Sequence, residues 1–166
     1  MDEQFTIRAL GKEDWQALKE IRLLSLTNHP GVYGRTAEQE AVFADEHWID
    51  MVTSEKCRVF GMFDAGVLIA IASVFTHHDD PTERTGLMAM WYMRDEYKGR
   101  NLFGPLIQAG IDWAKERFDT IKVNHRGGNH ASQANILKAG FKHIGTEDWT
   151  WPDGQTADYC MYEMRL

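Results

Sequence analysis

One segment constrains the fold of this chain more than any other. Residues 87–93 form an apolar run that predicts a strand ending at Met93, and the basic, glycine-containing sequence YKGRNLFG at 97–104 follows as a loop. Pro105 fits only the first turn of a helix, so the amphipathic run over residues 102–118 begins near here. Backbone N–H groups and the positive end of the helix dipole then face one spot, which suits a phosphate. A surface loop that caps a helix explains the same residues.

Composition narrows the class of protein. The 166 residues, 43% of them hydrophobic, predict one globular domain over 1–166. A net charge of −7 argues against a general nucleic-acid surface and is compatible with an amine substrate. Cys57 and Cys160 are the only cysteines, which favours two reduced thiols over a disulfide framework. The acidic N-terminus does not resemble a signal peptide and no apolar run reaches membrane-spanning length, so we expect a cytoplasmic protein without a membrane partner.

Hydrophobic periodicity predicts eleven elements in the order β-α-α-β-β-β-α-β-α-β-β. The predicted helices cover residues 12–26, 36–52, 102–118 and 130–139, and the predicted strands cover 5–10, 58–63, 67–76, 87–93, 120–125, 141–145 and 158–166. Thr36 and Gln39 form a capping-box pattern at the start of the second helix. This order predicts a mixed sheet with helices packed on it, an α/β (α+β) fold.

A second motif follows the phosphate loop. Asn129 comes twenty-five residues after Gly104, and the helical sequence HASQANILKAGF closes on Gly140 and Phe141. The two motifs in this order resemble the GNAT superfamily of N-acetyltransferases, over nearly the whole chain. The segment EIRLLSLTNHPGVYGRTAEQEA at 20–41 is similar to the paired N-terminal helices that shape the acceptor side in that superfamily.

The resemblance implies a fold and a cosubstrate. The implied fold is a GNAT-like mixed, largely antiparallel sheet of about six to seven strands, with helices on both faces and a splay between strands four and five where the cofactor enters. It also implies an acyltransferase that uses acetyl-CoA as cosubstrate and no metal. The residues implied to bind the cofactor are Met93, Lys98, Gly99, Arg100, Asn101, Leu102, Phe103, Gly104, Asn129, Ile136 and Lys138.

Three of these residues depart from the family pattern. Asn101 replaces a glycine, and we expect positive φ there because asparagine is the least costly substitute. Phe103 replaces a small residue and lies on the apolar stripe of the helix, so we expect its side chain to point into the core. Ile136 stands where the family often has a tyrosine that protonates the departing thiolate.

The other implied residues also have plain structural explanations. Met93 matches the position whose backbone pairs with the pantetheine arm, close to the donor that polarises the thioester carbonyl, but it also reads as an ordinary strand residue. Asn129 suits a helix cap as well as a cofactor contact, and Lys138 suits an exposed helix position.

No catalytic residue can be assigned from spacing. Candidate general bases lie near strand ends: His77, His78, Glu83 and His125. Candidate acids, each also consistent with a core or rim position, are Tyr92, Tyr159, Tyr162, His130 and Ser132. The sequence HHDD at 77–80 does not predict a metal site, because adjacent side chains on an extended chain point in opposite directions.

Three hypotheses follow. In the first, a small-molecule or peptide amine attacks acetyl-CoA directly, without a covalent enzyme intermediate. The alternative is a non-catalytic acyl-CoA-binding sensor or interaction module of the same fold. In the third, Phe103 fills the cleft and there is no CoA site. The Trp-rich segment at 147–152 suits an acceptor pocket, a homodimer interface or the core, and the sequence leaves the oligomeric state open.

Overall fold

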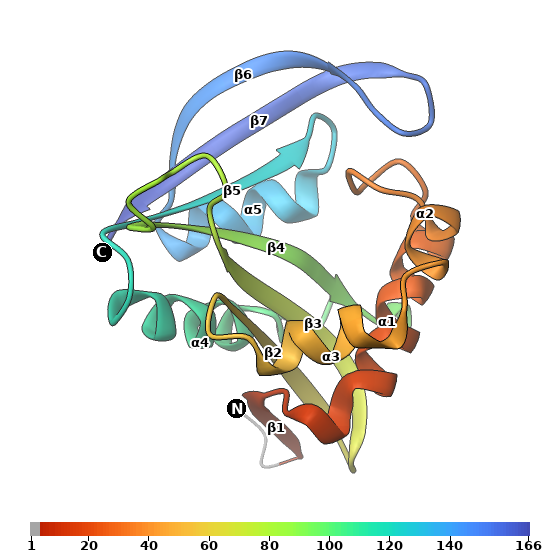
Figure 1. Ribbon diagram of the computed structural model, residues 1–166. Helices are drawn as coiled ribbons and strands as arrows, with labels where there is room; N and C mark the ends of the chain where they lie inside the picture. The colour runs from red at the N-terminus through yellow and green to blue at the C-terminus, as the bar shows by residue number, and fades with distance from the viewer. Residues whose placement is uncertain (1–3) are drawn as a thin grey trace.

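Seven β-strands form one mixed sheet in residues 4–166, the part of the chain that this computed structural model describes (Figure 1). The strands are β1 (Phe5–Ala9), β2 (Cys57–Asp64), β3 (Val67–Thr76), β4 (Thr85–Met93), β5 (Thr120–Arg126), β6 (Lys142–Thr150) and β7 (Thr156–Arg165). Their order in space is β1-β2-β3-β4-β5-β7-β6, and only the β4–β5 pair is parallel. The predicted mixed, largely antiparallel sheet is confirmed.

Helices cover both faces of the sheet, as predicted. They are α1 (Trp15–Asn28), α2 (Ala37–Ala41), α3 (Asp45–Thr53), α4 (Gly104–Lys115) and α5 (His130–Ala139), with short 3-10 turns η1 (Lys12–Asp14) and η2 (Asp95–Tyr97). Adjacent side chains of a strand point to opposite faces. Leu68 of β3 therefore packs in the cluster beneath α1 and α3, whereas Ile69 packs with Leu106 of α4 on the other side.

The second predicted helix is two helices. The capping box at Thr36 starts α2 as expected, with Gln39 N–H donating to Thr36 Oγ1 at 3.2 Å, but residues 42–44 are not helical. The prediction of one helix over 36–52 was wrong for a tertiary reason. Glu40 at the end of α2 turns inward to pair with buried Arg22 of α1, while Trp48 of α3 lies in the core cluster beside β2. The bend at residues 42–44 allows both contacts to form.

The splay between β4 and β5 is also confirmed. These strands pair only between Thr85–Leu87 and Thr120–Lys122, whereas β5 pairs with β7 along its whole length. Beyond Leu87 the two strands separate, and the β6–β7 hairpin arches across the same end of the molecule (Figure 1). Because the strands diverge, residues 88–93 of β4 and 123–126 of β5 face a common space. None of the helices in residues 4–166 has the length and apolar character needed to cross a bilayer.

Candidate functional site

A cleft of about 1090 Å³ opens where β4 and β5 separate. Most of its wall comes from residues 88–93 of β4, residues 123–126 of β5, the 97–103 loop, the start of α5 with the loop before it, and residues 29–34 of the loop after α1. Arg22 of α1 and two residues of the β6–β7 hairpin, Trp151 and Asp153, complete it. The cleft therefore joins the segment predicted to bind phosphate to the segment predicted to shape the acceptor side.

The backbone of the 97–103 loop takes the shape that the sequence predicts. Gly99 has φ of 76° and Asn101 has φ of 56°, so the expected positive φ at Asn101 is confirmed. α4 then begins at Gly104 with Phe103 as its N-cap residue, and no described side chain caps this end. A Cβ atom added at Gly99 or Gly104 would meet nothing within 4 Å. Pro105 has no N–H, and the N–H groups of Leu106 and Ile107 donate to the Phe103 carbonyl at 3.1 and 3.2 Å. An anion at this end of α4 would therefore depend on N–H groups of the 97–103 loop and of Gly104.

Phe103 does not fill the cleft. Its side chain packs against two core clusters, and its ring centre lies 5.7 Å from that of Trp91 in a tilted arrangement. The ring packs on the core as expected, and Phe103 is also one of the residues that line the cleft.

Seven of the predicted cofactor residues line the cleft and four do not. Those in the wall are Met93, Lys98, Gly99, Asn101, Leu102, Phe103 and Asn129. Ile136 is fully buried in the core beneath α5 and lies outside the wall, as does Gly104. The guanidinium carbon of Arg100, a residue of the loop itself, lies 5.5 Å from the Phe5 ring centre, and Lys138 Nζ from α5 donates to Asn101 Oδ1 at 2.9 Å. Asn129 also accepts a hydrogen bond from Ser132 N–H, so the predicted helix cap is confirmed.

Lys98 is held at the mouth of the cleft by a small polar network. Its Nζ donates to Asp95 Oδ1 at 2.5 Å and lies 3.0 Å from His29 Nε2. The hydrogen bond from Lys98, followed by that from His29, lowers the pKa of Asp95. A carboxylate therefore already balances the Lys98 ammonium.

A β-bulge shapes the middle of β4. Ile71 pairs with Tyr92 and Ser73 with Ala89, so two residues, Met90 and Trp91, oppose one on β3. Met90 has φ of 58°, and the bulge lies in the cleft wall. Such a bulge leaves its extra residue out of the strand ladder and re-aims the local backbone.

Two hydroxyl groups hold this bulge in place. Ser73 Oγ donates to the Ala89 carbonyl at 2.7 Å, and the Tyr33 hydroxyl donates to the Trp91 carbonyl at 2.8 Å. Burial raises the pKa of Tyr33 to about 12, so this hydroxyl keeps its proton at neutral pH. Sequence reasoning missed Tyr33 and the bulge. The apolar run does not alternate between polar and apolar residues, so its sequence does not show where an extra residue interrupts the strand pairing.

The candidate acids and bases are mostly engaged or elsewhere. His125 lines the cleft, but its Nδ1 lies 2.7 Å from the Arg126 carbonyl and its Nε2 lies 2.9 Å from the Tyr162 hydroxyl. Since a carbonyl only accepts, Nδ1 carries the proton and Nε2 accepts from Tyr162, which leaves no free ring nitrogen. Tyr159, Tyr162 and His130 lie outside the cleft wall, and Tyr92 and Ser132 lie in it.

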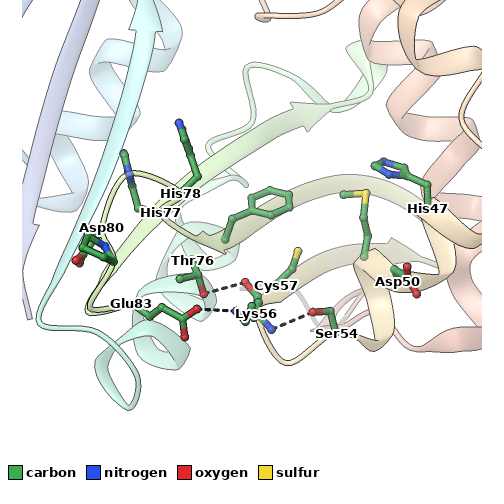
Figure 2. Close-up of a pocket in the computed structure, with 13 residues that line it drawn as sticks. His47, Asp50, Ser54, Lys56, Cys57, Thr76, His77, His78, Asp80 and Glu83 are labelled. Carbon is green, nitrogen blue, oxygen red and sulfur yellow. Dashed lines mark hydrogen bonds and ion pairs between the residues drawn. The ribbon is translucent and has the colours of Figure 1, made fainter.

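The other three candidate bases belong to a different pocket. This second pocket, of about 500 Å³, lies between α3, the start of β2 and the loop after β3 (Figure 2). His77, His78 and Glu83 line it, and Glu83 pairs with Lys56 at 2.6 Å. Burial raises the pKa of the Cys57 thiol here to about 12, so it is protonated at neutral pH and unsuited to act as a nucleophile.

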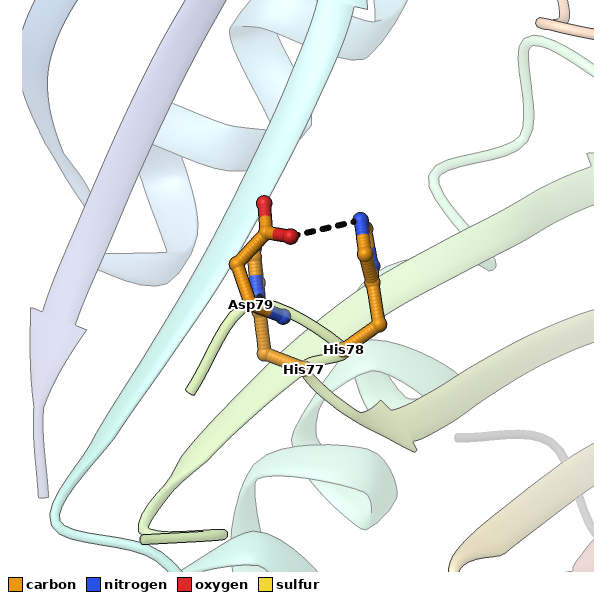
Figure 3. Close-up of side chains that lie close together, drawn as sticks. All are labelled: His77, His78 and Asp79. Carbon is orange, nitrogen blue, oxygen red and sulfur yellow. Dashed lines mark hydrogen bonds and ion pairs between the residues drawn. The ribbon is translucent and has the colours of Figure 1, made fainter. Parts of the chain in front are cut away.

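The structure brings His77, His78 and Asp79 together, contrary to the expectation that adjacent side chains diverge (Figure 3). One potential ligand atom from each lies within 4.8 Å of the others. The chain turns here, with Asp80 N–H donating to the His77 carbonyl at 3.3 Å, so the extended geometry assumed for this segment was wrong. His78 and Asp79 are 78% and 75% exposed, so water competes for every ligand position and the cluster alone does not define a metal site.

Arg126 lies at the end of the cleft where the loop after α1 meets the β6–β7 hairpin. Its Nη1 donates to the Gly31 carbonyl and to Asp153 Oδ2, both at 2.7 Å, and its Nη2 donates to Gln155 Oε1 at 3.1 Å. The guanidinium thereby ties the loop after α1 to the β6–β7 hairpin. Sequence reasoning missed this residue, because no local pattern links β5 to two distant loops.

The same hairpin carries the Trp-rich segment. Trp151 is buried and lines the cleft, and Trp149 packs on it with ring centres 4.8 Å apart while remaining 43% exposed. Trp151 thus lines the cleft, whereas Trp149 is partly exposed to solvent.

Comparison with known families agrees with this architecture. The model of the acetyltransferase (GNAT) domain family matches residues 4–142. The chain belongs to the GNAT acetyltransferase family. No curated protein matches the sequence.

Solved structures resemble this GNAT protein along its whole length. A GNAT-family acetyltransferase from Streptococcus pneumoniae is 15% identical, with 98% of this chain and 99% of that chain covered and a TM-score of 0.83. YncA from Salmonella typhimurium, whose structure contains its cofactor acetyl-CoA, is 18% identical over 99% and 95%, also with a TM-score of 0.83. A ribosomal-protein-alanine N-acetyltransferase from Brucella melitensis is 18% identical over 97% and 99%, with a TM-score of 0.79. At these sequence identities, the structural similarity shows a shared fold and nothing more specific.

Proposed function

We propose that this protein is an N-acetyltransferase that moves an acetyl group from acetyl-CoA to a primary amine by direct attack. One observation carries the proposal: the cleft between β4 and β5 runs from the 97–103 loop, which leads into α4, to residues 29–34 of the loop after α1. The same structural class includes YncA with bound acetyl-CoA and a protein named as an N-acetyltransferase of ribosomal proteins, which supports acetyl transfer to an amine.

The phosphate end of the proposed site uses mainly the backbone. The left-handed residues Gly99 and Asn101 turn the loop so that N–H groups from 99 to 104 point toward a pyrophosphate at the start of α4. Lys98, Arg100 and Lys138 supply positive charge around that point, at the wall and the rim. Ile136 anchors α5 in the core, and Asn129 at the start of α5 borders the cleft.

The reacting end uses β4. An amine nitrogen forms a bond to the thioester carbon, the C–S bond breaks, and the proton lost by nitrogen passes to the thiolate through solvent. Negative charge develops on the carbonyl oxygen, and we assign its stabilisation to backbone N–H groups of the bulge at Met90–Trp91, near Met93. One such donor is commonly worth about 3 kcal/mol. A thiol with a pKa of about 8.5 leaves without an assisting acid near neutral pH, so the absence of a tyrosine at Ile136 is compatible with turnover.

A thermal melt with saturating acetyl-CoA tests the binding half of the proposal. Ligand at 100 times its dissociation constant adds about 2.7 kcal/mol, which corresponds to a rise in Tm of roughly 5–10 °C for a domain of this size. Release of free thiol on addition of small-molecule and peptide amines then tests transfer. A shift without thiol release from any amine supports an acyl-CoA-binding module instead. No shift at millimolar acetyl-CoA contradicts both.

A further inference from the structure

Tyr33 connects the loop after α1 to the β4 bulge. Its hydroxyl donates to the Trp91 carbonyl at 2.8 Å, and Trp91 is one of the two bulge residues. A bulge leaves backbone groups out of the strand ladder. The Tyr33 hydroxyl thus supplies this carbonyl with a partner from outside the sheet, in a stretch of β4 that lies beyond its pairing with β5.

The Tyr33 ring is held independently of its hydroxyl. The Arg22 guanidinium carbon lies 4.9 Å from the ring centre, close enough for a cation–π contact. Arg22 is itself fixed by two hydrogen bonds to the Glu40 carboxylate, at 2.9 and 2.8 Å, and both side chains are buried. Because these contacts involve the ring and not the hydroxyl, removal of the hydroxyl alone should leave the ring in place.

The loop that carries Tyr33 is anchored at two further points. The Gly31 carbonyl accepts from Arg126 Nη1 at 2.7 Å, and His29 Nε2 lies 3.2 Å from Asp95 Oδ1. The loop thus contacts β5 and the turn η2 as well as the β4 bulge. A hydroxyl on this loop can therefore hold the bulge in a fixed relation to the rest of the cleft wall.

The carbonyl that Tyr33 holds belongs to the peptide group between Trp91 and Tyr92. A peptide group is planar, so the direction of its carbonyl also fixes the direction of its N–H. The adjoining peptide, between Met90 and Trp91, belongs to the same bulge, in which Met90 has φ of 58°. Backbone donors stabilise a developing oxyanion effectively only when they are held in advance at the place where its charge appears. The bulge therefore needs a restraint of this kind if its N–H groups are to serve in acetyl transfer.

We propose that Tyr33 is a positioning residue for acetyl transfer, whose hydroxyl orients the bulge backbone that we assign to the thioester oxygen. Tyr33 acts through the Trp91 carbonyl and does not itself touch the reacting atoms. This inference rests on the proposed acetyltransferase function and adds a residue of the loop after α1 to it.

The first test uses the free protein and Tyr33→Phe, which removes the hydroxyl and keeps the ring. Loss of one such hydrogen bond should make the backbone amides of Met90, Trp91 and Tyr92 exchange hydrogen about three- to tenfold faster, as measured by NMR. The Tm should fall by about 2–5 °C.

Tyr162→Phe is the matched control. It also removes a tyrosine hydroxyl that is hydrogen-bonded, in this case at 2.9 Å from His125 Nε2, and Tyr162 lies outside the cleft wall. We expect a comparable fall in Tm, with amide exchange at the bulge unchanged.

The decisive readout is the infrared stretch of the thioester carbonyl in bound acetyl-CoA that is labelled with ¹³C at this carbon. Hydrogen bonds to a carbonyl oxygen lower its stretching frequency. We therefore expect a higher frequency in complex with Tyr33→Phe than with the wild type or Tyr162→Phe. The dissociation constant of acetyl-CoA should stay close to the wild-type value, since the 97–103 loop is unchanged.

The contrary results are separable. An unchanged carbonyl frequency in Tyr33→Phe would overturn the proposal even if the bulge amides exchanged faster, because the hydroxyl would then have a structural role alone. Unchanged amide exchange would overturn it as well. A large loss of acetyl-CoA affinity would assign Tyr33 to binding instead of positioning. If acetyl-CoA does not raise the Tm of the wild type, the acetyltransferase proposal fails first and this inference falls with it.

Discussion

Substitutions at Asn101 test whether the backbone shape of the 97–103 loop creates the cofactor site. Asn101 adopts φ of 56°, where asparagine is tolerated and a β-branched residue is an outlier. Left-handed backbone costs an ordinary residue about 1–2 kcal/mol. Asn101→Val should therefore lower the Tm by roughly 2–8 °C. If valine relieves the strain by flipping the loop, the arrangement of N–H groups that we propose for pyrophosphate binding is lost.

The assay is the Tm with and without acetyl-CoA. We expect Asn101→Gly, which adopts the same φ without strain, to keep the full ligand-induced shift of roughly 5–10 °C. Asn101→Val should lose at least tenfold in affinity, equivalent to about 1.4 kcal/mol, so its shift falls to about half or less.

Glu83→Val provides the matched control. Glu83 has the same φ of 56° but lies in the loop after β3, in the wall of the second pocket. It should lose stability as Asn101→Val does while keeping the ligand-induced shift. The reasoning would be refuted if Asn101→Val were destabilised but retained the full shift, because the loop shape would then be irrelevant to binding.

Three further predictions concern the acceptor end, the core and acid stability. A Cβ at Gly31, which has φ of 82°, would lie 2.6 Å from Asp153 Oδ2 and 2.8 Å from Arg126 Nη1; Gly31→Ala should raise KM for the amine more than KM for acetyl-CoA, and equal effects on both would contradict this. Ile136→Ala removes a fully buried side chain and should cost about 2–5 kcal/mol in chemical denaturation, with acetyl-CoA binding retained by the folded protein. Hydrogen bonds, first from the Thr82 hydroxyl, lower the pKa of Asp80 to about 2. The stability that this carboxylate contributes is present above its unfolded pKa near 4 and is lost as the pH falls toward 2, so the Tm difference between wild type and Asp80→Asn should shrink over that range.

The features that sequence reasoning predicted are those set by local chemistry. Positive φ at Asn101, the capping box at Thr36 and the cap at Asn129 each depend on a few neighbouring residues, and all three are confirmed. The break between α2 and α3 depends on Arg22, eighteen residues from Glu40 in the chain. No pattern within residues 36–52 contains that information. The hydrophobic periodicity of the segment therefore predicted one continuous helix where the structure has α2 and α3.

The same distinction explains the uneven prediction of the site. The cofactor loop is contiguous, and its position after a strand and before a helix can be read from sequence. The end proposed to take the acceptor is assembled from α1 and the loop after it, β4, β5 and the β6–β7 hairpin, held by contacts such as that between Arg126 and Gly31. His77, His78 and Glu83 were plausible bases near strand ends, but which pocket a strand end faces is decided by the sheet order and the splay, not by the strand itself.

The departures from the family pattern fall at positions where the proposed site does not need the family side chain. At Asn101 the loop requires a dihedral angle, which asparagine supplies. At Phe103 the ring packs on two core clusters and leaves the cleft open. Ile136 is fully buried, so a tyrosine placed there without other changes would overpack the core before it reached the cleft. The proposed acetyl transfer depends on the backbone of the 97–103 loop, the start of α4 and the β4 bulge, so it can tolerate all three substitutions. A comparison of side-chain motifs alone therefore underestimates how much of such a site this chain shares with its family.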